Sequence, residues 1–198
     1  MKEIFFATTN KDKIMKMKNR LKNLDIKIIT PYDNNINIKI EENGKTVIEN
    51  AKLKAKAYFD KIQIPTIATD SALYVEKFDS QPGLFVKRIN GVTLNDDKLE
   101  EHYINELNKV GGKSKAFYIT GIVLVQKEKV SSIEIKEEDF IFTSKVCEEK
   151  RNFDPLSRLE YDETLKKYFC QLNEIEIDKR GYKFDVEAKK FIKDNLIR

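Results

Sequence analysis

The sequence predicts an α/β domain built on a mixed β-sheet with flanking helices, and three observations lead to this fold class. In the first half of the chain, short apolar runs alternate with stretches in which apolar residues recur at helical spacing. In the second half, residues 116–125, 130–135 and 140–146 form β-like runs in succession, which is typical of antiparallel strands. The length of 198 residues and the hydrophobic content of 40% suit one domain, or one domain with two lobes, around a sizeable core.

The chain opens with a predicted strand at residues 4–7, followed by a helix with an apolar face. The residues that recur at helical spacing in this helix are Ile14, Met17, Leu21 and Leu24. Between the strand and the helix, the segment TTNKDK from Thr8 to Lys13 carries cap-forming side chains, so backbone N–H groups and Lys13 can converge on a phosphate. The alternative is an ordinary capped helix with solvated lysines, because the segment is not a Walker-type glycine loop.

A second strand is predicted at residues 26–29, and a second helix follows Thr46. Thr46 and Glu49 have the spacing of a capping box. The apolar stripe of this helix is formed by Val47, Ile48, Ala51, Ala55, Tyr58, Phe59 and Ile62. The capping box accounts for Glu49, whereas Glu42 is left in the loop before the helix and Lys54 lies on a more polar flank.

Residues 67–91 give the strongest indication of chemistry in the chain. Their first apolar run predicts a strand that ends at Thr69, Asp70 and Ser71, which would expose a rigidly held carboxylate. Because ligands of open α/β sheets bind at strand ends, Asp70 is a candidate metal ligand or general base, and a polar turn residue is the alternative. Magnesium is typically bound by one or two protein carboxylates, with water and substrate phosphates as the other ligands. Glu42 and Asp70, from separate loops, would be such a pair of carboxylates.

The composition limits the classes of function. The 37 basic and 33 acidic residues leave a net charge of +4, which suits an anionic substrate, as do Lys87 and Arg88, but equally suits a solvated lysine-rich surface. Two cysteines without paired spacing, Cys147 and Cys170, and a single histidine, His102, argue against a zinc site or a His-dependent triad. Catalysis would therefore depend on carboxylates, lysines, arginines and a divalent metal. The sequence has neither a membrane-length apolar run nor a signal-peptide pattern, so we expect a soluble, intracellular protein.

The remaining periodic stretches complete the predicted fold. A helix begins near residues 94–97 and has Leu99, Tyr103 and Leu107 on its apolar side. After the three β-like runs, a last amphipathic helix is predicted from Tyr182 to Ile197. The inward-facing residues of that helix are Phe184, Ala188, Phe191 and Ile192.

Three ordered segments resemble the signatures of the inosine triphosphate pyrophosphatase family, whose members hydrolyse non-canonical purine nucleoside triphosphates. Residues 7–13 (ATTNKDK) are similar to its T-x-N-x-x-K, residues 41–55 (EENGKTVIENAKLKA) to its E-x-G-x-T-F-x-E-N-A-x-x-K-A, and residues 70–73 (DSAL) with Pro82-Gly83 to its D-S-G-L and P-G. The first half of the chain matches closely and the second half loosely. The resemblance implies one nucleotide pyrophosphatase domain over residues 1–198, elongated, with two lobes around a central cleft.

The resemblance also implies roles for individual residues. Glu42 and Asp70 would hold magnesium, or manganese, and Asp70 would also help to activate the attacking water. The contacts to the triphosphate and the rest of the substrate would come from Thr8, Asn10, Lys13, Lys54, Ser71 and Arg88. Two positions depart from the family, because Thr69 stands where a second acidic residue is usual and Ala72 where glycine is frequent. Loss of the acid at position 69 would weaken metal binding or move the metal.

The second half of the chain carries the family's base-recognition segments in altered form. The glycine-aromatic-aspartate-proline segment is matched by residues 152–155 (NFDP), and the serine-histidine-arginine segment by residues 178–180 (DKR). By resemblance, Phe153 would stack on the base and Arg180 would donate to a purine oxygen. Asp154 and Lys179 are further candidate substrate contacts. A core aromatic and a helix-start salt bridge are the alternatives for Phe153 and Arg180.

The expected reaction is metal-dependent hydrolysis of inosine, deoxyinosine and xanthosine triphosphates (ITP, dITP and XTP) to the monophosphate and pyrophosphate, which sanitises the nucleotide pool. A pyrophosphatase for other modified nucleotides, such as pyrimidine forms, is one alternative. A non-catalytic nucleotide-binding protein is another, against which the retention of Glu42 and Asp70 argues. We expect a cytoplasmic homodimer with a nucleoside triphosphate substrate and neither a membrane nor a nucleic acid as partner.

Overall fold

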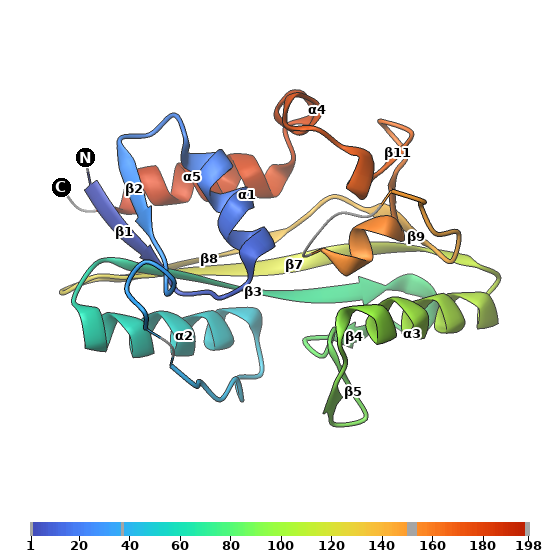
Figure 1. Ribbon diagram of the computed structural model, residues 1–198, viewed down its shortest axis with the longest axis horizontal. Coiled ribbons are helices and arrows are strands. Elements are labelled where there is room, and N and C mark those ends of the chain that lie inside the picture. Colours follow the sequence, from blue (N-terminus) through green and yellow to red (C-terminus); the bar gives the residue numbers. More distant parts are fainter. Residues whose placement is uncertain (1, 37, 150–153, 197–198) are drawn as a thin grey trace. The chain divides into compact units, whose positions relative to one another are not determined.

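The structure is a computed structural model that describes residues 2–36, 38–149 and 154–196 (Figure 1). Its helices are α1 (Lys11–Leu21), α2 (Val47–Ile62), α3 (Asp96–Lys109), α4 (Glu174–Arg180) and α5 (Lys183–Asn195), with short 3-10 turns η1 (Glu76–Phe78), η2 (Pro155–Arg158) and η3 (Phe169–Gln171). Its strands are β1 (Lys2–Phe6), β2 (Ile26–Ile29), β3 (Thr66–Val75), β4 (Gln81–Gly83), β5 (Arg88–Ile89), β6 (Val92–Thr93), β7 (Lys113–Val125), β8 (Val130–Lys136), β9 (Phe140–Thr143), β10 (Glu160–Asp162) and β11 (Lys167–Tyr168).

The described strands form one mixed sheet of nine strands and a separate β5–β6 pair. Neighbours in the large sheet follow the order β11-β10-β9-β7-β3-β1-β2, with β4 paired to β3 and β8 paired to β7. Strand β1 is parallel to β2 and β3, whereas β7 is antiparallel to β8 and β9. The mixed sheet with flanking helices confirms the fold class that the sequence predicts.

The chain divides into two compact units. Unit 1 comprises Met1–Ser71, Ile119–Lys136 and Lys183–Arg198, and unit 2 comprises Ala72–Tyr118 and Glu137–Tyr182. The expectations of a single domain over residues 1–198, of an elongated shape and of a cleft between two lobes stay predictions.

In unit 1 the sheet has helices on both faces, α2 on one and α1 with α5 on the other (Figure 1). Successive side chains of a strand point to opposite faces, so Ile4 and Phe6 of β1 pack with α1 and α5, while Phe5 packs with α2. A parallel strand covered on both faces must be apolar throughout, which explains the run IFFA at the start of the chain. This three-layer packing fixes the ends of α1 and α2, where the predicted site residues lie.

Unit 2 has its own apolar core, in which α3 packs against the sheet. Leu99, Tyr103 and Leu107 of α3 are buried there, as their spacing predicts. The Tyr103 hydroxyl donates to the Val86 carbonyl (2.9 Å), and its ring meets Phe142 edge-on at 5.3 Å between centroids.

Several sequence expectations are confirmed by these elements, one is wrong, and one helix has no counterpart in the sequence predictions. Strand β2 and helix α2 have the predicted positions, and the last helix buries Ala188, Phe191 and Ile192 as expected. The strand expected to end near Asp70 instead continues to Val75, and helix α4 was not predicted.

Candidate functional site

Asp70 lies inside β3 rather than at its end, which corrects the expectation from the sequence. The strand pairs with β1 at Thr66 and Ile67 and with β4 from Leu73 onward, so Asp70 falls between these two pairings. Its side chain is 13% exposed and therefore largely covered, not an open turn carboxylate. The residue still lies just beyond the carboxyl end of β1, which is the edge of an α/β sheet that binds ligands.

Lys54, Glu42 and Asp70 form an ion cluster in unit 1. The Lys54 Nζ atom lies 2.9 Å from Asp70 Oδ1 and 3.5 Å from Glu42 Oε2. The Lys54 side chain is 14% exposed and that of Glu42 39%, so one edge of the cluster faces solvent. Helix α2 brings Lys54 to the strand, because its apolar stripe packs on the sheet and leaves the polar flank at the sheet edge. The cluster thus combines three of the charged residues that the resemblance assigns to phosphate and metal binding.

The loop before α2 is tied to the start of the helix. Thr46 Oγ1 accepts the Glu49 N–H (3.1 Å), and Glu49 Oε2 accepts the Lys45 N–H (2.6 Å), one residue earlier than in a strict capping box. Gly44 donates its N–H to Asn50 Oδ1 at 2.8 Å. These bonds explain Glu49 structurally, as predicted, and they anchor the loop that carries Glu42.

The segment from Thr8 to Lys13 joins β1 to α1 as the sequence predicts. Asn10 is the N-cap of α1, and its Oδ1 accepts the Lys13 N–H at 3.1 Å. Thr8 Oγ1 accepts the Asn10 N–H at 3.2 Å, which tightens the turn. The start of α1 therefore lies at the carboxyl end of β1, where the helix N-terminus favours an anion.

Ser71 follows Asp70 on β3, and its hydroxyl lies 2.9 Å from the hydroxyl of Thr120 on β7. Thr120 is buried, and the hydroxyl pair connects two strands next to the ion cluster. Thr69, at the position where an acid was expected, is 6% exposed, and Ala72 is fully buried in the sheet. A neutral Thr69 adds no third carboxylate to the cluster.

The candidates in unit 2 do not gather in this way. Phe153 lies outside the described residues, and Asp154 is half-buried at the start of η2. Arg88 and Lys179 are exposed, and their side chains have no hydrogen-bond or ion-pair partner within the described chain. The structure therefore describes no common pocket for these four residues.

Arg180 has a defined environment in unit 2. It is the last residue of α4, whose C-cap Gly181 adopts the left-handed conformation, and it lies just before α5, so its ion pair with Asp162 agrees with the salt-bridge alternative for this residue. The Arg180 Nε atom lies 3.4 Å from Asp162 Oδ2, and the guanidinium lies 5.1 Å from the centre of the Tyr182 ring. This Nε is buried without a hydrogen-bond acceptor among the described residues. Burial opposes ionisation of Asp162, but hydrogen bonds from Tyr182 and Leu165, with the charge of Arg180, hold its pKa below the usual value.

Unit 1 offers two carboxylates, Glu42 and Asp70, as oxygen ligands for a hard cation, which is a small number of protein ligands. Glu42 and Asp70 converge on one ammonium, so a divalent ion near that position would meet the same two carboxylates. Within the described residues there is no group of three or more His, Cys, Asp or Glu side chains arranged to hold a metal. Both thiols are free, as expected, and burial raises the pKa of Cys170 to about 12.

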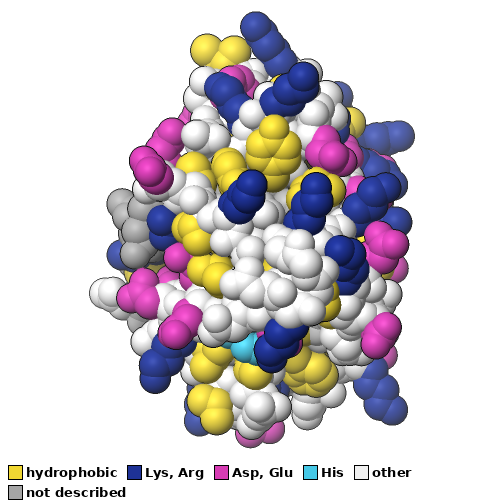
Figure 2. Space-filling model, turned by 90° about the vertical axis from the view of Figure 1, so that its right-hand side faces the viewer, with side chains coloured by type: hydrophobic (Ala, Val, Ile, Leu, Met, Phe, Trp, Pro, Cys, Tyr) yellow, Lys and Arg dark blue, Asp and Glu magenta, His cyan; other side chains and the backbone are white. Residues whose placement is uncertain are grey.

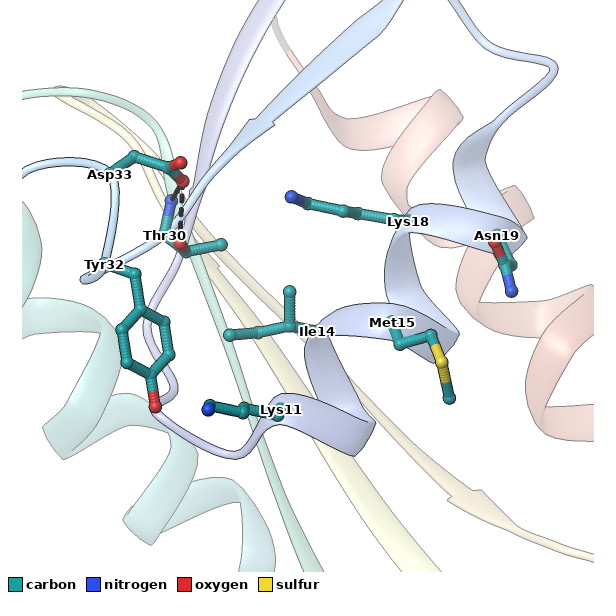
Figure 3. A pocket seen from close by; sticks show the side chains of 8 residues that line it. All are labelled: Lys11, Ile14, Met15, Lys18, Asn19, Thr30, Tyr32 and Asp33. Carbon is teal, nitrogen blue, oxygen red and sulfur yellow. Dashed lines mark hydrogen bonds between the residues drawn. The ribbon is translucent and has the colours of Figure 1, made fainter. Parts of the chain in front are cut away.

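A separate hollow of about 460 Å³ lies beside the Thr8–Lys13 segment in unit 1 (Figure 3). Its lining residues are Lys11, Ile14, Met15, Lys18, Asn19, Thr30, Tyr32 and Asp33. The Tyr32 hydroxyl donates to the Thr9 carbonyl (2.7 Å), which supports the turn before α1. Asp33 accepts the Thr30 hydroxyl (2.6 Å), and this bond lowers the pKa of Asp33. None of the predicted site residues lines this hollow.

Charged side chains are mixed on the face drawn in Figure 2, where Asp and Glu lie among Lys and Arg. This mixture agrees with the solvated surface that a net charge of +4 allows. No helix in the described parts of the chain is long and apolar enough to cross a bilayer.

Sequence reasoning missed Asn50, Gly44 and Thr120 as parts of the site. Asn50 and Gly44 stand within residues 41–55, whose resemblance to a family signature was noted, but they received no role. Their bonds depend on how the loop folds back on α2 and how α2 meets β3. The sequence pattern does not encode that geometry directly.

Comparison with known proteins adds an independent finding. Residues 4–181 match the Ham1 family. The chain is 30% identical over 188 residues to a Thermoanaerobacter pseudethanolicus protein named dITP/XTP pyrophosphatase, with coverage of 94% of this chain and 93% of that protein. It is 34% identical over 142 residues to a Leptospira interrogans protein of the same name, with coverage of 71% of each.

Solved structures agree with the fold. The Staphylococcus aureus Ham1 protein superposes with a TM-score of 0.75 at 23% identity, covering 98% of this chain and 99% of its own. A HAM1 protein from Coxiella burnetii superposes with a TM-score of 0.78 at 22% identity, covering 98% and 100%. At these identities the likeness concerns the fold alone.

Proposed function

This chain belongs to the Ham1 family, and from that premise we propose that it hydrolyses non-canonical purine nucleoside triphosphates to the monophosphate and pyrophosphate. The relatives named dITP/XTP pyrophosphatase point to dITP and XTP, with ITP as a third substrate. The observation that carries the proposal is the convergence of Lys54, Glu42 and Asp70 in unit 1. The chemistry is a displacement at the α-phosphorus that leaves pyrophosphate.

In this mechanism the residues of unit 1 bind the triphosphate and orient the water. The backbone N–H groups at the start of α1, with Thr8, Asn10 and Lys13, bind phosphate oxygens. Lys54 neutralises phosphate charge as a point charge, and Ser71 contributes a hydroxyl beside it. Asp70 accepts a hydrogen bond from the attacking water and orients it, so positioning and electrostatics provide most of the acceleration.

A divalent metal, magnesium or manganese, is part of the proposal. Glu42 and Asp70 would hold it, because they are the carboxylates that already share one cation in this structure. When bound, the metal supplies positive charge that stabilises the phosphate oxygens during displacement. Thr69 supplies no further carboxylate, so the rest of the coordination would come from water and phosphate.

Base selection is assigned to residues of unit 2. The Arg180 side chain is 23% exposed, and the N–H groups on the exposed part of its guanidinium would donate to a purine 6-oxo group. Phe153 would stack on the base, with Asp154, Lys179 and Arg88 as further substrate contacts. Arg88 and Lys179 are exposed, so their side chains are open to a ligand.

The test is pyrophosphate release from a panel of triphosphates with magnesium. In a panel that includes the guanosine and pyrimidine forms, we expect dITP, ITP and XTP to be hydrolysed faster than adenosine triphosphate, and excess chelator to abolish the activity. A preference for modified pyrimidine nucleotides would redirect the substrate assignment. Binding of dITP without turnover, in protein supplied with magnesium or manganese, would identify a non-catalytic nucleotide-binding protein instead.

We also propose that the protein acts in the cytoplasm as a homodimer, with neither a membrane nor a nucleic acid as partner. The nucleotide pool that it would cleanse is cytoplasmic, and the mixed charge in Figure 2 is unlike a surface built for a polyanion. Light scattering at micromolar concentration tests the dimer, because a monomer mass would contradict it.

A further inference from the structure

Asn50 is a buried polar residue for which the catalytic scheme above has no role. It lies in the first turns of α2 and is 4% exposed. Buried amides require partners for both ends, and here the two ends reach different segments of unit 1. The Oδ1 atom accepts the Gly44 N–H at 2.8 Å, and the Nδ2 atom donates to Asp70 Oδ2 at 3.1 Å.

The chemistry of its neighbours fixes the orientation of this amide. An ionised carboxylate only accepts hydrogen bonds and a backbone N–H only donates, so the Asn50 NH2 must face Asp70 and its oxygen must face Gly44. The flipped amide would place oxygen against oxygen and N–H against N–H. Asn50 is therefore held in one orientation by the two segments that it connects.

Gly44 is the residue that permits this arrangement. A Cβ atom at position 44 would lie 2.7 Å from Asn50 Oδ1 and 2.7 Å from Glu49 Cβ, both closer than such atoms approach. Only glycine lets the loop that carries Glu42 close on the amide. One side chain thus connects the Glu42 loop with the strand that holds Asp70.

The two oxygens of Asp70 are held by donors of different mobility. Lys54 holds Oδ1 at 2.9 Å, but its long stem is flexible, it is shared with Glu42, and its proposed role is to bind a phosphate. Asn50 holds Oδ2 with a short side chain on a packed helix. When the Lys54 ammonium moves to a phosphate, the Asn50 amide is the side-chain donor that still orients the carboxylate.

We propose that Asn50 is a positioning residue for the hydrolysis, holding the Asp70 carboxylate at the angle needed to orient the attacking water. The inference rests on the proposed pyrophosphatase function. It assigns Asn50 no contact with the nucleotide, so it predicts an effect on kcat rather than on KM.

Two variants separate the bonds of Asn50. Asn50→Asp keeps an acceptor for the Gly44 N–H but loses the donor to Asp70, and Asn50→Leu keeps the volume but loses both bonds. We expect each to lower kcat for dITP about 10- to 100-fold, the rate equivalent of losing a hydrogen bond to a charged group. KM should stay within about threefold, because ground-state binding is unchanged.

Thr46→Ala is the matched structural control. It removes the hydroxyl cap of α2, which accepts the Glu49 N–H, and leaves both side-chain bonds of Asn50 and the Thr46 carbonyl that accepts the Asn50 backbone N–H at 3.1 Å. We expect a lower Tm with kcat retained. The inference is overturned if kcat falls in proportion to the loss of Tm in all three variants, Thr46→Ala, Asn50→Asp and Asn50→Leu. Asn50 would then have a structural role alone.

A double-mutant cycle tests whether Asn50 acts through Asp70. In an Asp70→Ala background, the addition of Asn50→Leu should change the residual kcat by no more than about twofold, since the acceptor is already gone. If the full effect of Asn50→Leu persists in that background, the residue acts elsewhere and the inference fails.

A measurement without turnover separates this inference from the proposed function. The Asn50 side-chain NH2 resonances in a 15N-labelled protein should shift and lose exchange protection in Asp70→Ala, but not in Lys52→Ala on an exposed part of the same helix. Resonances indifferent to Asp70→Ala would refute the contact, even in an active enzyme. A wild-type protein that releases no pyrophosphate from dITP, yet shows the shift, would refute the function and leave the contact standing.

Discussion

The two units of this protein differ in how far their candidate residues converge. In unit 1, the Lys54 Nζ atom lies within 3.5 Å of carboxylate oxygens of both Glu42 and Asp70. In unit 2, Arg180 is engaged with Asp162 and Tyr182, while Lys179 is exposed. Displacement at phosphorus needs a few charged groups at fixed mutual distances, whereas base selection can be reached by several arrangements of contacts. The residues proposed to bind phosphate therefore match a recognisable sequence pattern more closely than those proposed to bind the base.

The largest effect that would sharpen this contrast is expected from Asp70→Asn. The substitution keeps the size of the side chain and removes the charge that orients water and would hold metal. We expect kcat on dITP to fall by about 100-fold or more, the usual scale for a group that positions a proton transfer. The measurement is steady-state pyrophosphate release, with Asp60→Asn as the control because Asp60 is an exposed carboxylate of α2. If the Asp70→Asn protein is folded and hydrolyses dITP at the wild-type rate, Asp70 has no catalytic role and β3 is only structural.

Lys54→Ala should have the next largest effect. Its removal takes a point charge from the phosphates and leaves Glu42 and Asp70 without their shared cation. We expect KM for dITP to rise about 10-fold, because the lost interaction joins two charged groups. Lys52→Ala, exposed on the same helix, should leave KM unchanged. A collapse of Tm with an unaltered KM would instead show that Lys54 serves folding.

A smaller effect is expected from Asn10→Ala, and unit 2 provides its control. Asn10 caps α1 in unit 1 and Asn95 caps α3 in unit 2, each accepting an N–H from the residue three positions later. Either substitution should cost about 1 kcal/mol of unfolding free energy. Only Asn10→Ala should also raise KM for dITP, since only that cap adjoins the proposed phosphate site. Equal KM values for the two variants would separate the α1 turn from the substrate.

The smallest expected effect concerns stability in acid. The pKa of Asp162 is below its ordinary value of 3.8, because the bonds from Tyr182 and Leu165 outweigh burial. A carboxyl with a lowered folded-state pKa stabilises the protein above its unfolded pKa, and this contribution is lost as the pH falls through the folded value. Asp162→Asn should therefore destabilise the protein at pH 6 and lose much of this difference below about pH 4. Urea titrations at several pH values measure it.

Asp33→Asn in unit 1 is the companion variant. The pKa of Asp33 is lowered mainly by the Thr30 hydroxyl, but the side chain is exposed, so solvent screens the interaction. Its acid dependence should be weaker than that of Asp162→Asn. A stronger acid dependence for Asp33→Asn than for Asp162→Asn would show that the bonds of Asp162 with Tyr182, Leu165 and Arg180 add less to the unfolding free energy than their geometry indicates.

The elements that could be predicted from the sequence are those in which apolar residues recur at regular spacing. Helices α1, α2 and α5 each bury one face against the sheet, and their residues follow the helical spacing. Helix α4 has no buried residue, so it gave no stripe, although Asn173 and Glu176 form a capping box that marks its start. Helix α4 was not predicted because its residues show no apolar periodicity, and its start is marked only by polar capping residues.

The candidate site was predictable in part. Asp70 was found, but its strand was expected to stop there, because Asp70 and Ser71 are polar and the pairing with β4 depends on residues farther along. The ion cluster with Lys54 depends on how α2 packs on the sheet. The family resemblance, and not the spacing of residues in the sequence, indicated that Lys54 belongs to the site. Arg180 ends α4, and Gly181 is a sequence sign of that end, but without an apolar stripe in α4 the residue was related only to the helix that follows.

The division of work between the two units is tested most directly by the ratio of kcat/KM for dITP to that for dATP. Lys54→Ala acts on phosphates that both nucleotides share, so it should lower both values and leave the ratio close to that of the wild-type protein. Arg180→Ala removes a donor for the 6-oxo group that only dITP carries, so the ratio should fall toward unity, about tenfold for each 1.4 kcal/mol of lost discrimination. A ratio that changes with Lys54→Ala and is unmoved by Arg180→Ala would contradict the account.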